Sequence, residues 1–340
     1  MFISERPAPS ARLLQHLQLR YGLSWSGDPV DLGGSSSLNL LLRDSRGDVV
    51  ARVHRDWLEP ARLTSIQGVR SALHAAGLPF PKPIPALDGS LWTRLGEQLV
   101  EVEHYREGEY MDSWPRLRTG MRMLAHVHSV LAGIAADPAG HTPPASNQID
   151  AREVIPSARR ASSAIRTWAR FDRDWAAIDR TETLADHLQA AWAPFAGALR
   201  RQLVHGDFWD NNVLFDANSI VLILDLDFMA ERERIDDIAL ILYYVNSGRM
   251  LHQSASLVER QRQLRELVDA YDRHLAPHLT AMERAAIPLA MARIVLAYTR
   301  HLCQRARVAD QRDVLTAWSP DLGWSLEIVR DLECWQAAFA

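Results

Sequence analysis

The segment from residue 204 to residue 225 constrains this 340-residue chain more than any other part of its sequence. It runs Val-His-Gly-Asp-Phe-Trp-Asp-Asn-Asn-Val-Leu-Phe, then Asp-Ala-Asn-Ser, then Ile-Val-Leu-Ile-Leu-Asp. The apolar runs at 213–215 and 220–224 predict buried strands, and residues 216–219 between them are rich in turn formers. We therefore expect an antiparallel hairpin here.

Polar side chains gather at the open end of this predicted hairpin. Asn212 enters the first strand and Asp225 leaves the second, offset by about two residues or roughly 7 Å along the strand. One ion could bridge them, and an amide oxygen with a carboxylate suits Mg²⁺, which takes few protein oxygens when it also binds phosphates. Asp207 lies in the loop leading to the same end, where it could accept or orient a hydroxyl proton. The alternative is that these three polar residues only lie at the strand ends of a buried hairpin and have no chemical role.

Taken together, the spacing resembles the catalytic segment of the kinase-like small-molecule phosphotransferases, a family that includes aminoglycoside phosphotransferases and choline kinases. Its pattern is His-Gly-Asp, four residues, Asn, and about a dozen residues to an Asp that ends an apolar strand, as in residues 205–225. The resemblance implies an α+β, protein-kinase-like fold with two lobes. We expect a small β-rich nucleotide-binding lobe over residues 1–105 and a larger, mainly helical catalytic and acceptor-binding lobe over residues 106–340.

The same resemblance implies roles for the residues of the segment. Asp207 is expected to be the catalytic base or hydroxyl-orienting residue, and Asn212 and Asp225 the Mg²⁺ ligands. His205 is expected to be structural. Asp237, in an Asp-Ile-Ala that looks like the family's Asp-Leu-Ala, is expected to open the next helix and steady the loop behind the metal site.

The acceptor pocket is the least determined part of the site. Trp209 and Asp210 stand where relatives often have His and Pro, so they are candidates for it, together with Asp227 and Glu231. Acidic residues around this loop would attract a cationic acceptor such as an aminoglycoside or an amino alcohol. Interleaved arginines leave open that these acids are only solvated loop charges. Tryptophans could contact a cation through their rings or belong to the core; the candidates are Trp209, Trp318 and Trp324.

The N-terminal third predicts a small sheet. A helix over 8–20 precedes strands at 38–43 and 49–54, which are joined by a turn at 44–48. Before the first strand lies Gly33-Gly34-Ser35-Ser36-Ser37. Glycines allow close backbone approach, and successive amides and hydroxyls can cradle phosphate oxygens. By itself such a run is often a flexible turn, but beside the 205–225 segment we interpret all five residues as nucleotide-binding.

Arg52 occupies the strand position that carries the phosphate-pairing Lys in this superfamily. Arginine keeps the charge and can bind phosphate through two N–H groups, so Arg52 is expected to act in nucleotide binding and in catalysis. The following helix, 60–76, has no acid where relatives often carry Glu, and Gln67 is the nearest polar substitute. We therefore expect Arg52 to be less firmly oriented than the corresponding Lys in relatives.

The remaining strands lead to the predicted interlobe hinge. The helix at 60–76 should end at Gly77, and strands are expected at 91–94 and 98–103. Hinge backbone groups read the adenine edge in relatives, so the resemblance marks Glu103 and Tyr105 as nucleotide-binding candidates. Beyond the hinge we expect a loop at 137–146 and helices at 117–135, 150–175, 182–201, 235–246, 256–275, 281–305 and 322–338.

Composition excludes several classes of function. The content of 47% hydrophobic and 24% charged residues is typical of a globular protein, and no apolar run is long enough to span a bilayer. Without a signal-peptide pattern, we expect a cytoplasmic protein. A net charge of −4 argues against nucleic acid as a partner. Lys82, the only lysine, lies between two prolines, which excludes a Walker A loop.

These observations favour a kinase that uses ATP and Mg²⁺ to phosphorylate a hydroxyl of a small molecule, with GTP an open alternative. Arg52 and the missing helix acid motivate a second hypothesis, a nucleotide-binding pseudokinase with a regulatory role. A third keeps the fold but transfers a nucleotidyl group. The sequence leaves monomer and homodimer equally open.

Overall fold

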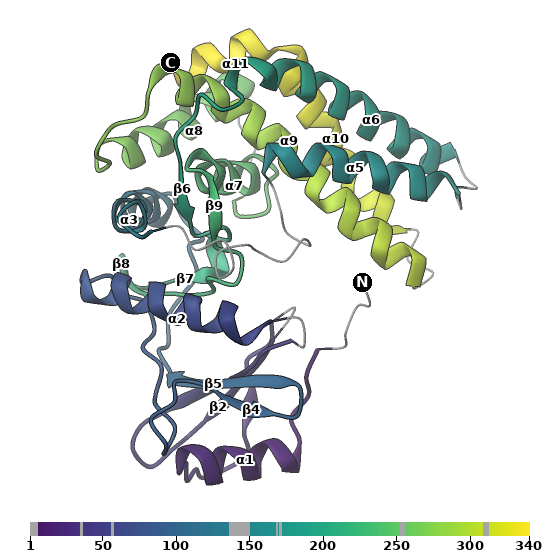
Figure 1. Cartoon of the computed structure of the whole chain (residues 1–340). Helices are drawn as coiled ribbons and strands as arrows, with labels where there is room; N and C mark the ends of the chain where they lie inside the picture. Colours follow the sequence, from purple (N-terminus) through teal and green to yellow (C-terminus); the bar gives the residue numbers. More distant parts are fainter. Residues whose placement is uncertain are drawn as a thin grey trace.

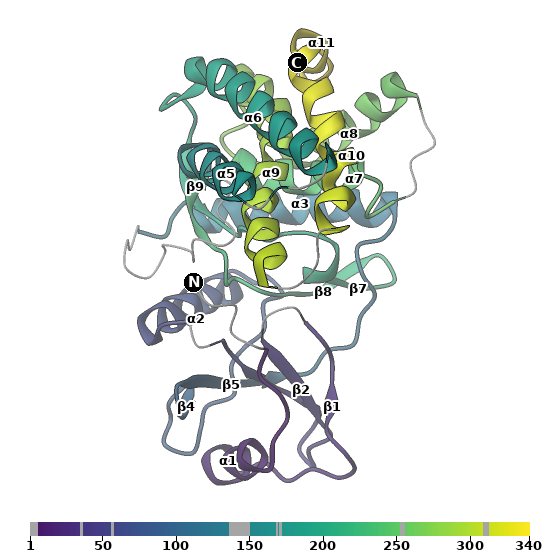
Figure 2. The same cartoon turned by 90° about the vertical axis from the view of Figure 1, so that its right-hand side faces the viewer.

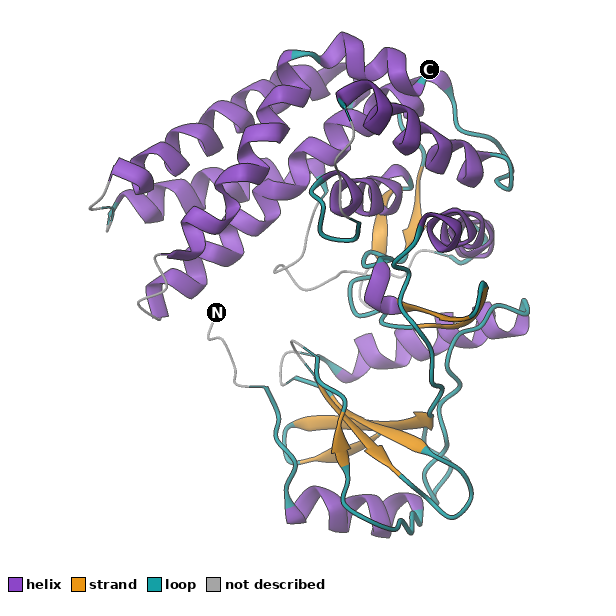
Figure 3. Ribbon diagram, turned by 180° about the vertical axis from the view of Figure 1, so that it is seen from behind, coloured by secondary structure: helices purple, strands orange, loops and turns teal. Residues whose placement is uncertain are grey.

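The structure, a computed structural model, describes residues 6–34, 37–55, 58–135, 150–167, 169, 172–251, 256–308 and 313–340, with the backbone alone for 173, 300–308 and 313–319. The chain forms a small lobe built on an antiparallel sheet and a larger helical lobe (Figures 1 and 3). The predicted α+β, two-lobed fold is confirmed. The predicted loop at 137–146 lies outside the described residues.

The small lobe is a five-stranded antiparallel sheet in the order β1-β2-β3-β5-β4. Its strands are β1 Val30–Asp31, β2 Leu38–Leu42, β3 Val49–Val53, β4 Thr93–Leu95 and β5 Gln98–His104. Helix α1, Ala11–Tyr21, covers the outer face of this sheet (Figure 1). Because β3 and β5 pair with Arg52 opposite Glu101, the charged side chains of both strands share one face.

Alternation along β3 and β5 divides the sheet into two chemically different faces. Ala51, Val53, Val100 and Val102 pack with the apolar residues of α1 in one core cluster. The opposite face presents Arg52, Glu101 and Glu103, all buried. The period of two therefore turns a row of charges toward the interior of the molecule.

Helix α2, Pro60–Ala75, lies between the sheet and the large lobe (Figures 1 and 2). Its apolar residues, including Leu63, Ile66 and Leu73, belong to the same core cluster as the helices of the large lobe. Gly77, at φ +80°, follows its end as predicted, in the left-handed region that glycine adopts without strain. The apolar stripe of α2 thus packs with the core of the large lobe, while the outer face of the sheet has a separate core with α1.

The large lobe is mainly helical, with two short antiparallel strand pairs. Strand β6, Arg201–Val204, pairs with β9, Ala230–Glu233, and β7, Val213–Asp216, pairs with β8, Ser219–Ile223. The helices are α3 Trp114–Leu131, α5 Ala151–Arg166, α6 Asp172–Trp192, α7 Ile235–Asn246, α8 Leu257–Asp272, α9 Ala281–Val308, α10 Asp313–Arg330 and α11 Leu332–Phe339. Every residue of α7 is buried, so this helix forms the centre of the lobe.

Three of the predicted helices differ clearly in extent from those in the structure. The helices predicted at 150–175 and 182–201 end or begin elsewhere, because α5 stops at Arg166 and α6 already starts at Asp172. Residue 201 begins β6, which is held by pairing with a strand some thirty residues later. The single helix predicted at 322–338 is two helices, since Asp331 leaves helical geometry at φ −106° and ψ 35°.

Within the ranges described above, no helix combines the length and the apolar character needed to cross a membrane.

Candidate active site

The predicted hairpin is present as β7 and β8, with Val213 opposite Ile223. Asn212 ends a short 3-10 turn, Asp210–Asn212, immediately before β7, and its carbonyl accepts a hydrogen bond from the amide of Leu224 at 2.8 Å. Asp225 follows β8 at φ +66°. The two candidate metal ligands therefore lie at the open end of the hairpin, as the turn position predicts.

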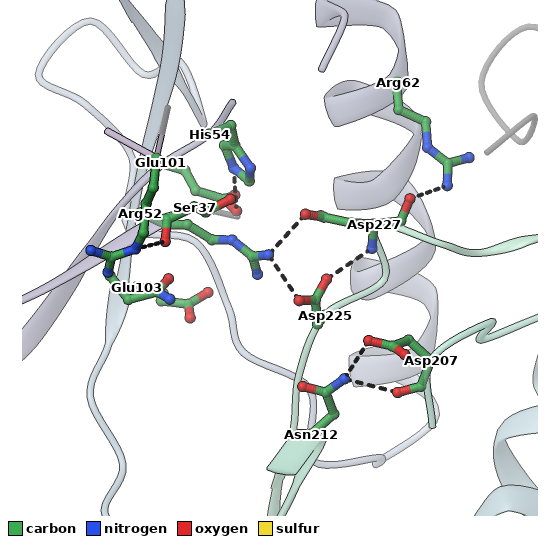
Figure 4. Close-up of polar contacts among 12 residues, drawn as sticks. Ser37, Arg52, His54, Arg62, Glu101, Glu103, Asp207, Asn212, Asp225 and Asp227 are labelled. Atoms are coloured by element: carbon green, nitrogen blue, oxygen red, sulfur yellow. Dashed lines mark hydrogen bonds and ion pairs between the residues drawn. The ribbon is translucent and has the colours of Figure 1, made fainter. Parts of the chain in front are cut away.

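Asn212 also fixes Asp207. Its side-chain Nδ2 donates to the carbonyl oxygen of Asp207 at 2.8 Å and to the carboxylate Oδ2 at 2.9 Å. This contact turns the amide oxygen of Asn212 away from Asp207 (Figure 4). The side-chain nitrogen of Asn212 thus holds the carboxylate of Asp207. The side-chain oxygen of Asn212 points away from Asp207 and can bind another ligand.

The pKa values of the Asp207 and Asp225 carboxyl groups are shifted in opposite directions by their surroundings. Burial and the charge of Asp225 raise the pKa of Asp207 well above its usual range. Burial acts on Asp225 in the same direction, but Arg52 and the amide of Asp227 outweigh it and lower the pKa of Asp225 overall. Asp207 is therefore the better proton acceptor, while Asp225 stays ionised.

The loop that carries Asp207 is anchored from behind by Asp237, in the first turn of α7. Its two carboxylate oxygens accept hydrogen bonds from the amides of His205 and Gly206, each at 2.8 Å. His128 on α3 lies 3.0 Å from the same carboxylate through Nε2. Burial alone would raise the pKa of Asp237, but His128 lowers it overall. This geometry fits the supporting roles predicted for His205 and Asp237.

Gly206 is required by both backbone conformation and space. It has φ +85°, and a Cβ at this position would lie 2.0 Å from the carbonyl oxygen of Phe228. The loop that carries Asp207 therefore passes directly against the backbone that follows β8. Only glycine allows this approach.

A pocket of about 360 Å³ lies between the lobes, with the hairpin end on one wall. It brings together these predicted residues: Gly33, Gly34, Ser37, Arg52, Glu103, Tyr105, Asp207, Trp209, Asn212 and Asp225. Ser35 and Ser36 lie outside the described residues. Sequence reasoning missed other lining residues: Leu32, Asn39, Val50, His104, Arg106, Gly108, Tyr110, Asn211, Leu214, Leu222 and Leu224. Val50 lies two positions before Arg52 and Leu214 two positions after Asn212, so the strand period of two was the signal that could have found them.

The two hinge candidates use their polar groups differently. The carboxylate of Glu103 accepts a hydrogen bond from Arg70 of α2 at 3.2 Å. The amide of Tyr105 donates to the carbonyl of Asp48 at 3.0 Å, so this N–H is already engaged by the turn before β3.

Arg52 is more firmly held than the sequence suggested. Its Nη2 lies 2.9 Å from Oδ2 of Asp227 and 3.2 Å from Oδ2 of Asp225 (Figure 4). Burial alone would lower the pKa of Arg52, but these two carboxylates raise it overall. Gln67 instead donates to Glu101 at 2.9 Å. The expectation of a loosely oriented Arg52 is therefore wrong, because its carboxylate partners come from the large lobe and not from α2.

The predicted acceptor residues fall in different places. Trp209 lines the pocket and stacks on Tyr244, with ring centroids 4.5 Å apart. Asp210 is half-buried in the turn before β7, and burial raises its pKa. Asp227 is buried against Arg52 and is not among the residues that line the pocket, and Glu231 is exposed on β9. Trp324 donates to Asp321 at 3.3 Å, and the side chain of Trp318 lies outside the described part of the chain.

Comparison with known proteins settles the family. A model of the phosphotransferase enzyme family matches residues 29–282. The chain belongs to this family. The resemblance inferred from residues 205–225 is thereby confirmed.

Curated relatives of the chain include homoserine kinases. The protein from Acidiphilium cryptum is 27% identical over 212 residues, and that from Rhodospirillum rubrum is 22% identical over 212 residues. Each alignment covers 62% of this chain and 61% of the relative. The chain thus spans about three fifths of the length of these relatives.

Solved structures share its fold. A microcompartment-associated aminopropanol kinase superposes with a TM-score of 0.69 at 17% identity, covering 97% of this chain and 99% of the other. An amicoumacin kinase, solved with AMP-PNP, Ca²⁺ and its antibiotic, gives 0.68 at 14% identity, covering 94% and 92%.

The close approach at Gly206 predicts that Gly206→Ala lowers the free energy of unfolding by about 2 kcal/mol or more. The added methyl must push away the backbone at Phe228. Gly77→Ala is the matched control, because Gly77 has nearly the same φ and a methyl group added there would meet nothing within 4 Å. Chemical denaturation would compare them, and equal losses would contradict the steric argument.

The anchoring role of Asp237 predicts that Asp237→Asn destabilises the fold by about 2 kcal/mol at pH 7, because an amide cannot accept the same three hydrogen bonds. A lowered native pKa means that this stabilisation is complete above the unfolded pKa near 3.9 and is lost as pH falls through the native value. Denaturation of both proteins should show a difference that persists at pH 5 and narrows below pH 4. A difference independent of pH would rule out the charge of Asp237 as the cause.

Proposed function

We propose that this protein is an ATP-dependent kinase that transfers a phosphoryl group to a hydroxyl of a small molecule. The observation that carries the proposal is the arrangement of Asp207, Asn212 and Asp225 at one end of the hairpin, on the wall of the interlobe pocket. Membership of the phosphotransferase family and similarity to homoserine kinases support it. Phosphoryl transfer depends mainly on positioning and charge neutralisation, which this site is built to supply.

Asp207 would orient the acceptor hydroxyl and take its proton. Its carboxylate is held by Asn212, and its raised pKa brings its basicity closer to that of a general base working near neutral pH. The fixed orientation matters as much as the basicity, because in-line attack requires the hydroxyl to be aligned with the transferred group.

Asn212 and Asp225 would hold a divalent cation. Their oxygens are hard ligands of the kind that Mg²⁺ prefers. The described residues contain no cluster of three or more His, Cys, Asp or Glu that could hold a metal, so the protein supplies few ligands, as expected where phosphates supply others. When bound, the cation would neutralise phosphate charge. The amicoumacin kinase structure, with its nucleotide analogue and Ca²⁺, supports this assignment.

The nucleotide would occupy the interlobe pocket. Gly33, Gly34 and Ser37 line it from the small lobe, beside Arg52, and Ser35 and Ser36 belong to the same glycine-serine run. Val50 and Leu214 add apolar surface on opposite walls, which suits a planar base.

The acceptor would be a hydroxyl compound with an amino group. Similarity to homoserine kinases and to an aminopropanol kinase supports this choice, since homoserine and aminopropanol each carry both an amino group and a hydroxyl group. Trp209 and Tyr244 offer stacked aromatic surface beside the catalytic loop, which can bind a cation. Asp210 adds a carboxyl group next to it.

Four further assignments remain predictions. They are the division of the chain between residues 105 and 106, a cytoplasmic location, a monomer or homodimer, and the lack of nucleic-acid and membrane partners. The missing acid on helix α2 no longer supports the pseudokinase hypothesis, because Asp225 and Asp227 pair with Arg52 in its place.

Asp207→Asn should lower kcat by about 10²–10⁴-fold, because the amide cannot accept the hydroxyl proton. Asp216→Asn, an exposed position on the same hairpin, is the matched control and should keep wild-type turnover. Products from Mg-ATP with homoserine, amino alcohols and aminoglycosides would be read by mass spectrometry. A product whose mass has increased by a nucleotidyl group would favour the nucleotidyl transferase hypothesis. Near-wild-type turnover of Asp207→Asn would refute the role of Asp207 as the base.

Asn212→Ala should raise the Mg²⁺ concentration needed for half-maximal activity by about tenfold or more, since one of two protein ligands is lost. Asn218→Ala makes the same change at the exposed far end of the hairpin and should leave the metal requirement unchanged. Activity titrated against Mg²⁺ at saturating nucleotide measures both. An unchanged requirement in Asn212→Ala would remove this residue from the metal site.

A further inference from the structure

We infer that Asp227 is the residue that positions Arg52, in the role that relatives assign to an acid on the helix after its strand, and that Arg62 of α2 holds the loop carrying Asp227. The inference rests on the proposed function, since Arg52 matters through the nucleotide phosphates. It makes Asp227 a positioning residue and removes it from the acceptor pocket.

The pair is buried and joins the two lobes. Arg52 is 8% exposed and Asp227 4% exposed, and their side chains meet at 2.9 Å although the residues are 175 positions apart. An ion pair that is so desolvated is costly to break, because one charge would be left buried alone. Asp227 therefore determines where the Arg52 guanidinium can lie.

Helix α2 cannot supply this carboxylate. Residues 60–75 contain no Asp or Glu, and the helix presents cations and an amide to the charged face of the sheet. Arg70 contacts Glu101 at 2.5 Å and Glu103 at 3.2 Å, and Gln67 also donates to Glu101. The polarity between helix and sheet is thus reversed: the helix carries the cation and β5 carries the acids.

Arg62 of α2 holds the loop that carries Asp227 and the candidate metal ligand Asp225. Its Nη2 donates to the carbonyl of Asp227 at 2.8 Å (Figure 4) and to that of Met229 at 2.7 Å. Burial lowers the pKa of Arg62 to about 10, against the opposing effect of Asp227, so the two carbonyl contacts compensate a guanidinium held out of water. On its other side, the amide of Asp227 donates to Oδ1 of Asp225 at 3.2 Å. The backbone of Asp227 is therefore held from both directions.

The arrangement separates two tasks that would otherwise compete for Asp225. Arg52 contacts both Asp225 and Asp227, and the contact to Asp227 is the shorter one. Because Asp227 can hold the guanidinium alone, Asp225 remains available to a cation without leaving Arg52 unpaired. Loss of the Asp227 charge should make Arg52 compete with Mg²⁺ for Asp225.

The test is a double-mutant cycle with Asp227→Asn and Arg52→Gln in the full-length protein. Binding of Mg²⁺ with a non-hydrolysable ATP analogue is measured by calorimetry, and KM for nucleotide and acceptor by kinetics. We expect Asp227→Asn to weaken nucleotide binding by about tenfold and to raise the Mg²⁺ requirement, with the KM for acceptor unchanged. The double variant should bind no more than about twofold worse than Arg52→Gln alone. The matched control is Asp88→Asn, which breaks an exposed ion pair with Arg20 in the same lobe and should change nothing.

Two results would overturn the inference: unchanged nucleotide binding in Asp227→Asn, or fully additive losses in the double variant. If thermal unfolding shows that Asp227→Asn does not fold, Arg62→Gln provides the second route. It loosens the loop while keeping both charges of the Arg52–Asp227 pair, and it should weaken nucleotide binding in the same direction, so unchanged binding there would also overturn the inference. Failure of the wild-type protein to bind the analogue would instead contradict the proposed function itself.

Discussion

The hydrogen bonds that Asp237 accepts from the amides of His205 and Gly206 are the contacts on which the rest of the site depends. They tie the loop that carries Asp207 to the first turn of α7, a helix buried along its whole length. Gly206 then lets the loop pass against the backbone at Phe228. With both ends of the loop fixed, Asp207 and Asn212 have little freedom, and a carboxylate that must align a hydroxyl benefits from that rigidity.

The second constraint is the two-faced sheet of the small lobe. Alternation places the apolar residues of β3 and β5 against α1 and the charged ones against α2. Since α2 also shares its apolar core with the large lobe, the charged face is enclosed and its groups must satisfy one another. The network of Arg52, Arg70, Glu101 and Asp227 follows from this enclosure, and it connects the small-lobe wall of the pocket to the loop that carries Asp225 and Asp227.

Local patterns predicted much of this. Strand propensity and turn residues gave the hairpin, and helix 235–246 matches α7 residue for residue. Predictions failed where distant contacts decide: Arg201 is in a strand because of its partner β9, and no local pattern marks the break at Asp331. The partner of Arg52 lies 175 positions away, beyond any spacing argument. The Val-Glu-Val-Glu run at 100–103 is a local pattern from which the shared face of Glu101 and Glu103 could have been predicted.

Arg52 connects these parts because it acts on two carboxylates at once. Its charge keeps Asp225 ionised despite burial, and the ionised Asp225 in turn helps to raise the pKa of Asp207. Two aspartates in one site thereby acquire different chemistry, one suited to hold a cation and the other to accept a proton. A lysine could supply the same charge, but the guanidinium has five N–H donors in a fixed plane. Arg52 meets both Asp225 and Asp227 through Nη2 alone, so the other arm of its guanidinium is not needed to hold these two carboxylates.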